Sequence, residues 1–187
     1  MQKKENIILG IDPGTTVMGY GLVLTSGSKL HLLQFGVIHL QKYQSHEIKL
    51  KKIFERVSDL IEEFAPDHVA LEAPFYGKNV QSMLKLGRAQ GVAMAAALTK
   101  DIPIREYAPK KVKQSVTGNG NASKEQVSEM IKRLLKFKDA PKLLDATDAL
   151  AVALCHHFSH KDHTSGNSAN GSGSWKSFVA NNPKRIS

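Results

Sequence analysis

The sequence is poor in the residues that build disulfide frameworks, thiol metal sites and membrane spans. Cys155 is the only cysteine among 187 residues, so a single chain can form neither a disulfide nor a site with several cysteine ligands. The longest apolar runs are far shorter than the roughly 20 residues of a transmembrane helix. The N-terminal segment does not resemble a signal peptide, because Asp12 interrupts its short apolar run. We therefore expect a cytoplasmic protein with no membrane partner.

Acidic residues are scarce relative to basic ones. The chain has 17 Asp and Glu against 26 Lys and Arg, a formal net charge of +9. This excess favours a polyanionic partner, nucleic acid first and an acidic membrane surface second. A charge that serves only solubility is the alternative. Apolar residues make up 41% of the chain, which is enough for the core of one α/β domain.

The hydrophobic pattern predicts five strands and four main helices. Strands are expected at 6–12, 16–25, 29–39, 67–72 and 102–107, helices at 46–64, 79–100, 123–136 and 143–157, and a loop with a short helix at 109–124. The first three strands form a meander, and helices alternate with strands after it. This order predicts an α/β fold with a five-stranded mixed sheet and helices on both faces.

Two segments stand out by composition. Helix 79–100 is rich in glycine and alanine, which suits close packing on the sheet or against a second copy of the chain. Residues 161–187 are rich in Ser, Gly, Asn and Lys and contain few apolar residues. We therefore expect one folded domain over 1–160 and a disordered basic tail over 161–187.

Four acidic residues lie where the predicted elements begin or end. Asp12 and Glu72 each end a buried strand, and Asp145 and Asp148 lie three residues apart near the start of the last helix. That spacing places the two aspartates on nearly the same side of the helix. We expect all four to converge at one edge of the sheet. Such crowded carboxylates require a cation, and oxygen ligands select Mg²⁺ or Mn²⁺. One or two such ions could activate water for phosphodiester hydrolysis.

Each acid also has a simpler interpretation. Asp12 precedes Pro13-Gly14, so a turn residue is an alternative. Asp145 and Asp148 could complement the dipole of the helix whose start they occupy. Their apolar surroundings, which include Ala149, favour a functional site over solvent-exposed acids without a functional role.

Several motifs resemble a known family. They are Ile11-Asp-Pro-Gly-Thr-Thr16, Gly19-Tyr-Gly21, Leu71-Glu-Ala-Pro-Phe75, Lys85-Leu-Gly-Arg-Ala-Gln-Gly91, Val112-Lys-Gln114 and Asp145-Ala-Thr-Asp-Ala-Leu-Ala151. In this order, over residues 6–158, they resemble the RuvC-type Holliday junction resolvases. The resemblance implies an RNase H-like nuclease domain and a homodimer that makes paired, symmetric nicks in four-way DNA junctions during recombination and repair. It also implies Mg²⁺ as cofactor, one or two ions per subunit with Mn²⁺ as a substitute, and a RuvA–RuvB branch-migration complex as partner.

The resemblance assigns roles to individual residues. The family's catalytic, metal-binding carboxylates fall on the four acids Asp12, Glu72, Asp145 and Asp148. Phe75 falls on the aromatic residue that the family places against a junction base, and an exposed aromatic can stack on an unpaired base. A half-buried loop aromatic is the alternative for Phe75.

Basic residues surround the predicted loop at 118–120. Lys113 and Lys124 match basic positions that the family uses near the scissile phosphate. With Lys110 and Lys111 they form a positive segment suited to phosphate contact, and a solvated loop is the alternative.

Three other functions are open to such a sequence. The segment after Ile11 also resembles the phosphate loop of actin-like ATPases, but the second glycine-rich loop that those proteins need is missing. An RNase H-like relative that processes RNA and a junction-binding protein without catalysis are the closer alternatives. Four acids argue against the binder, because they would repel phosphates.

Overall fold

A computed structural model of the chain describes residues 5–74, 79–137 and 144–164, with side chains up to residue 159 in the last segment. The strands are β1 Glu5–Asp12, β2 Val17–Ser26, β3 Lys29–His39, β4 His68–Glu72 and β5 Ile104–Tyr107. The helices are α1 His46–Phe64, α2 Val80–Leu98, α3 Pro109–Thr117, α4 Lys124–Leu135 and α5 Leu144–Thr164. The number, type and order of the elements agree with the sequence prediction.

The five strands form one mixed sheet in the order β3-β2-β1-β4-β5. β1, β2 and β3 pair antiparallel as a meander, whereas β4 pairs parallel with β1 and β5 parallel with β4. Parallel neighbours place their C-terminal ends at the same edge of the sheet. The ends of β1 and β4, and therefore Asp12 and Glu72, lie at that edge.

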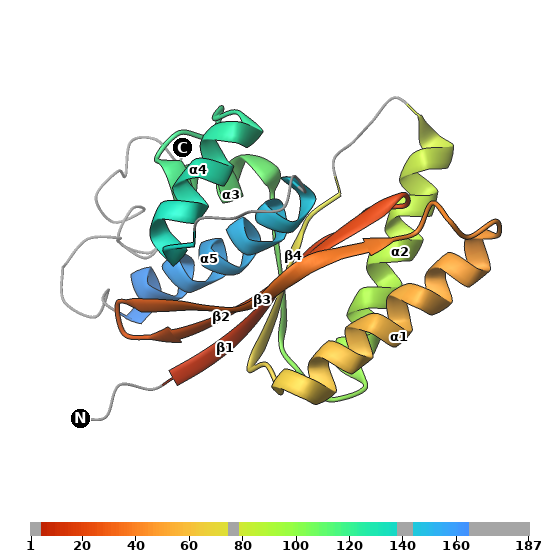
Figure 1. Ribbon diagram of the computed structural model, residues 1–187, viewed down its shortest axis with the longest axis horizontal. Helices are drawn as coiled ribbons and strands as arrows, with labels where there is room; N and C mark the ends of the chain where they lie inside the picture. The colour runs from red at the N-terminus through yellow and green to blue at the C-terminus, as the bar shows by residue number, and fades with distance from the viewer. Residues whose placement is uncertain (1–4, 75–78, 138–143, 165–187) are drawn as a thin grey trace, which may run out of the picture.

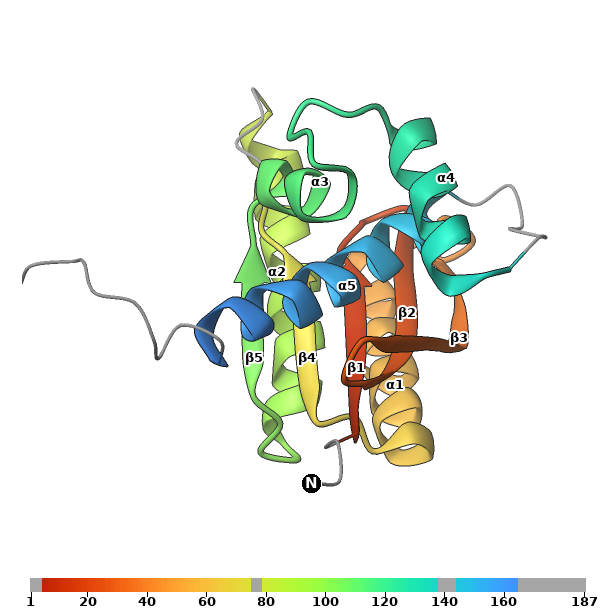
Figure 2. The same cartoon turned by 90° about the vertical axis from the view of Figure 1, so that its left-hand side faces the viewer.

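Helices cover both faces of this sheet (Figures 1 and 2). α1 and α2 pack on one face around large aliphatic side chains that include Leu9, Ile11 and Leu60. α5 lies across the other face, with α3 and α4 beside it, around a second core that includes Val112 and Ile131. The predicted α/β sandwich with an RNase H-like sheet is confirmed.

The alternation of side chains along a strand decides which face each acid occupies. In β1, Leu9 and Ile11 belong to the core under α1 and α2, whereas Ile8 belongs to the core under α5. Asp12 has the same parity as Ile8, so it lies on the α5 face. In β4, Ala70 packs under α5, and the same parity places Glu72 on that face.

Glycines in the strands let α5 lie directly on the sheet. A Cβ atom on Gly10 would overlap the carbonyl oxygen of Ala149, and one on Gly19 would overlap the carbonyl oxygen of Asp145. Gly19 is also the antiparallel partner of Asp12. The absence of a side chain at Gly19 therefore lets the backbone of Asp145 approach the strand pair that carries Asp12.

Two boundaries differ from the prediction for local reasons. β5 begins at Ile104 rather than at residue 102, because Pro103 has no N–H to offer to a strand ladder. α5 was expected to end near residue 157 but continues to Thr164, into the first residues assigned to the tail. Polar residues there are compatible with a helix, and the first glycine after them is Gly166. Residues 165–187 lie outside the described residues, so their disorder stays a prediction.

None of the described helices combines the length and the apolar composition needed to cross a bilayer.

Candidate active site

Three carboxylates meet at the rim of the sheet. Asp12 at the end of β1 and Asp145 and Asp148 in the first turns of α5 each offer an oxygen, and these oxygens all lie within 4.8 Å of one another. Glu72, at the end of β4, lines a pocket of about 110 Å³ together with Asp12. The structure therefore brings together the four acids that the sequence predicted to converge.

The electrostatics of this rim are those of crowded, partly desolvated acids. Burial, with added repulsion from Glu72 and Asp148, raises the pKa of Asp12 to about 8. Burial and repulsion from Asp148 raise the pKa of Glu72 to about 7. Burial also raises the pKa of Asp148, although Lys124 opposes the shift. Without a cation the cluster is therefore costly to ionise near neutral pH.

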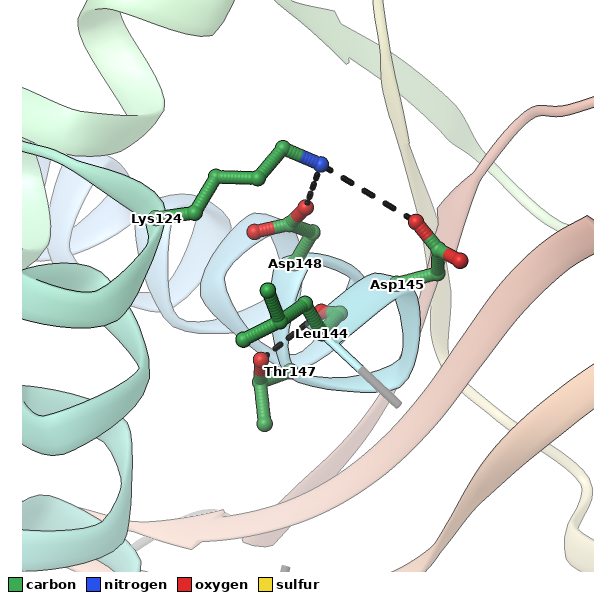
Figure 3. A network of polar contacts seen from close by, with 5 residues as sticks. All are labelled: Lys124, Leu144, Asp145, Thr147 and Asp148. Carbon is green, nitrogen blue, oxygen red and sulfur yellow. Dashed lines mark hydrogen bonds and ion pairs between the residues drawn. The ribbon is translucent and has the colours of Figure 1, made fainter. Parts of the chain in front are cut away.

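Lys124 contacts the cluster directly (Figure 3). Its Nζ donates a hydrogen bond of 2.7 Å to Oδ2 of Asp148 and lies 3.9 Å from Oδ1 of Asp145. Burial alone would lower the pKa of Lys124, but the hydrogen bond and the charges of the acids outweigh burial and raise it. The lysine therefore remains a cation while it contacts the acids.

The other predicted contact residues are distributed unevenly. Lys113 is half-buried in α3, and its positive charge lowers the pKa values of Glu72 and Asp148. Lys110 and Lys111 are exposed on the same helix. Among the described residues, the lysines whose charge lowers the pKa values of Asp12, Glu72 or Asp148 are thus Lys113 and Lys124. Phe75 lies outside the described residues.

The pocket beside Asp12 and Glu72 contains residues for which the sequence suggested no role. Leu86 and Gln90 of α2 line it, and Gln90 is buried and donates a hydrogen bond through Nε2 to Glu106 Oε1. In the sequence, Gln90 is a polar residue between Ala89 and Gly91 in a segment of small and apolar residues. Such a position indicates a polar side chain that needs a partner inside the fold, because buried polar side chains need partners. α2 therefore contributes one wall of the acidic rim.

The donor set fits a hard divalent cation. Three carboxylate oxygens from a rigid strand and a rigid helix lie close enough to share one ion, and no softer ligand accompanies them in the grouping of described residues. A cation of charge +2 would also offset the burial and the repulsion that together raise the pKa values of Asp12 and Glu72. The arrangement is that of a divalent metal site.

An acidic rim on this mixed sheet defines a protein of the RNase H-like nuclease class. The family profile described as crossover junction endodeoxyribonuclease RuvC matches residues 8–156. The chain belongs to this RuvC family.

Individual relatives agree over almost the whole chain. The chain is 62% identical to the crossover junction endodeoxyribonuclease RuvC of Cytophaga hutchinsonii, over 97% of this chain and 88% of that protein. It is 57% identical to the protein of the same name from Porphyromonas gingivalis, over the full length of both. Among solved structures, RuvC of T. thermophilus in complex with Holliday junction substrate is 34% identical, with a TM-score of 0.79 over 85% of this chain and 97% of that one.

Proposed function

We propose that the chain is a structure-selective endonuclease that resolves four-way DNA junctions by paired, symmetric nicks, with Mg²⁺ as its metal. The observation that carries the proposal is the convergence of Asp12, Asp145 and Asp148, with Glu72 beside them, in a member of the RuvC family. The relative from T. thermophilus was solved with a Holliday junction substrate, which supports the choice of DNA structure.

We assign the four carboxylates as metal ligands. When bound there, a divalent ion would neutralise charge at the scissile phosphate and would make an attacking water more acidic. The protein fixes the ligands, since Asp12 and Glu72 end rigid strands while Asp145 and Asp148 start a buried helix. Mn²⁺ should substitute for Mg²⁺, because both accept oxygen ligands in octahedral geometry. We expect one or two ions per subunit, and metal titration would count them.

The DNA strand would lie over the rim, where α3 and α4 present basic residues. Lys113 and Lys124 are close enough to the acids to influence their charge, so they are suited to the phosphate next to the cut. Lys110 and Lys111, exposed on α3, would contact more distant phosphates. For Phe75 we keep the role of stacking on a junction base.

Symmetric cutting requires two sites, and α2 offers a surface for a homodimer. Its exposed stripe contains the large apolar residues Val80, Leu84 and Leu98, which are 66%, 52% and 59% exposed. Between them lie Gly87 and Gly91, where an added Cβ would meet nothing within 4 Å. These glycines are not needed for packing within the chain, so close approach of a second α2 would explain them. Sedimentation should report a dimer; a monomer at high micromolar concentration would refute this.

Two further parts of the proposal rest on the family. We place the enzyme in the cytoplasm, and we propose that a RuvA–RuvB branch-migration complex supplies its junctions. Co-purification with such a complex on junction DNA would test the partnership.

The decisive experiment incubates the purified protein with a synthetic four-way junction and Mg²⁺. Linear duplex and an RNA–DNA hybrid of the same sequence serve as matched substrates. We expect paired nicks in the junction alone. Preferential cutting of the hybrid would favour an RNA-processing enzyme, and tight junction binding without any cutting would favour a non-catalytic binder.

A further inference from the structure

Lys124 occupies a place in the acidic rim that a metal ion would need. Its ammonium contacts Asp148 at 2.7 Å and Asp145 at 3.9 Å. We propose that Lys124 is a built-in counterion of the metal-free enzyme, which the metal displaces from the acids. The inference rests on the proposed metal site and goes beyond it, because it gives this lysine a role before DNA arrives.

The backbone at Lys124 is fixed while its side chain is free to move. Lys124 is the first residue of α4, directly after the N-cap Ser123, and a capping box between Ser123 and Gln126 closes this helix end. The lysine side chain is still 53% exposed, with a flexible four-carbon stem. The ammonium can therefore leave the acids without any rearrangement of α4.

Helix energetics do not explain a lysine at this position. The N-terminus of a helix carries a partial positive charge, which disfavours a cation and favours acids such as the neighbouring Glu125. Asp148, whose side chain is only 14% exposed, offers the compensating contact. The contacts with the acids of α5 therefore stabilise Lys124 at this position, whereas the dipole of α4 does not.

Metal binding and the lysine contact compete for the same carboxylates, Asp145 and Asp148. Oδ2 of Asp148 accepts the hydrogen bond from Lys124, and Asp148 also belongs to the group of carboxylates that can share an ion. Two cations cannot approach the same carboxylate without repelling each other. Entry of a metal should therefore release the ammonium toward the strand of DNA over the rim, so that one ion both completes the site and frees a phosphate contact.

Competition predicts that removal of the lysine charge strengthens metal binding in the absence of DNA. We would titrate Mn²⁺ into metal-free protein at pH 8 by calorimetry. Lys124→Met, which keeps the apolar stem, should bind Mn²⁺ about tenfold more tightly than the wild type, the scale expected when a partly buried charge contact no longer competes. Lys124→Arg retains the cation and should show no such gain. Lys124→Gln provides a second neutral variant if the methionine variant does not fold.

Lys113→Met is the matched control, because Lys113 also acts on Asp148 but makes no direct ion pair with it among the described residues. Its Mn²⁺ affinity should change by no more than about twofold, since charges that are not in contact are screened by solvent and salt. Equal gains in Lys113→Met and Lys124→Met would overturn displacement in favour of a general charge effect. An unchanged or weaker affinity in the neutral Lys124 variants would also overturn it, while wild-type protein that binds no Mn²⁺ would refute the metal site itself.

Displacement also has a direct chemical readout. An amine-acetylating reagent should modify Lys124 several-fold faster once Mn²⁺ is present, because the released Nζ no longer donates to Asp148. Peptide mass spectrometry would measure the rate at each lysine in the same sample, with exposed Lys51 of α1 as the internal reference. Unchanged or slower modification of Lys124 relative to Lys51 would show that the ammonium stays in place.

Discussion

The two faces of the sheet are packed by different means. Under α1 the core is filled by large side chains such as Leu9, Leu22 and Leu60, and α2 adds buried alanines to the same core. Under the first half of α5, Gly10 and Gly19 remove the intervening side chains, and the helix backbone lies against the strands. The first face is built for burial of apolar area, and the second is built for the position of a helix.

This difference explains why the acids can be held so closely. A residue that is held only by side-chain packing shifts when its neighbours move. Asp145 is held instead by close contact between its own backbone and β2 at Gly19. Fixed ligands are what a metal site requires, since small displacements are costly to catalysis. The α5 face holds the crowded acids, and the apolar cores on both faces provide burial that offsets their repulsion.

The largest expected effect comes from the acids themselves. Asp12→Asn should reduce junction cleavage by at least about 10²- to 10³-fold, the range seen when one preorganised electrostatic group is removed. Junction binding without added metal should survive. Asp59→Asn, at an exposed position of α1, is the matched control and should cut at the wild-type rate. Gel assays of nicking and binding measure both properties, and equal cleavage by Asp12→Asn and wild type would end the metal-site assignment.

A second pair of variants separates stability from geometry. Gly19→Ala should force α5 away from the sheet, because its Cβ overlaps the carbonyl oxygen of Asp145. We expect a loss of about 1–3 kcal/mol in the free energy of unfolding, as for overpacked sites. A shift of the ligands by about 1 Å would lower kcat about 10²-fold.

Leu60→Ala is the counterpart on the other face. It should leave a cavity and cost about 2–5 kcal/mol of stability, yet retain kcat at a temperature where the protein is folded. Urea unfolding and single-turnover cleavage provide the two measurements. If the Leu60 variant loses kcat as severely as the Gly19 variant, the proposed division between the faces is wrong.

In metal-free protein, acids on the two faces should also differ in how they make the free energy of unfolding depend on pH. The pKa of Asp12 is raised from 3.8 to about 8, so folded protein keeps a proton that the unfolded chain releases near pH 4. The contribution of this proton to the free energy of unfolding is complete below pH 4. It declines as the pH rises and is lost once the pH has passed 8, a decline on the order of a few kcal/mol. Mg²⁺ should abolish the decline, and Asp12→Asn should make it shallower.

Glu55 on α1 gives the opposite case, because a hydrogen bond from Lys52 lowers its pKa. Glu55→Gln should therefore leave the decline between pH 4 and 8 unchanged. Thermal melts across this range, with and without Mg²⁺, test the contrast; a flat profile for metal-free wild type would contradict the raised pKa of Asp12.

The sequence predicted much of this site because the acids lie at element ends. Apolar runs located β1 and β4, and their alternation is sufficient to place Asp12 and Glu72 on one face. It did not predict the contact between Lys124 and Asp148, since these residues lie on different helices and a helical period says nothing of how two helices pack. The close approach at Gly19 was also missed, although a glycine inside a strand is a known sign of such contact.

The smallest expected effect concerns DNA contact away from the acids. If the DNA backbone runs over α3 on the α5 side, exposed Lys110 should contact one phosphate, whereas Lys51 of α1 should contact none. Lys110→Gln should then weaken junction binding a few-fold and reduce the slope of log K against log salt by about 1, while Lys51→Gln leaves both unchanged. Filter binding from low to moderate salt measures the slope. Equal effects of the two substitutions would mean that basic charge anywhere on the molecule contributes to DNA binding. The difference between the α5 face and the α1 face would then not extend to binding, even if it holds for catalysis.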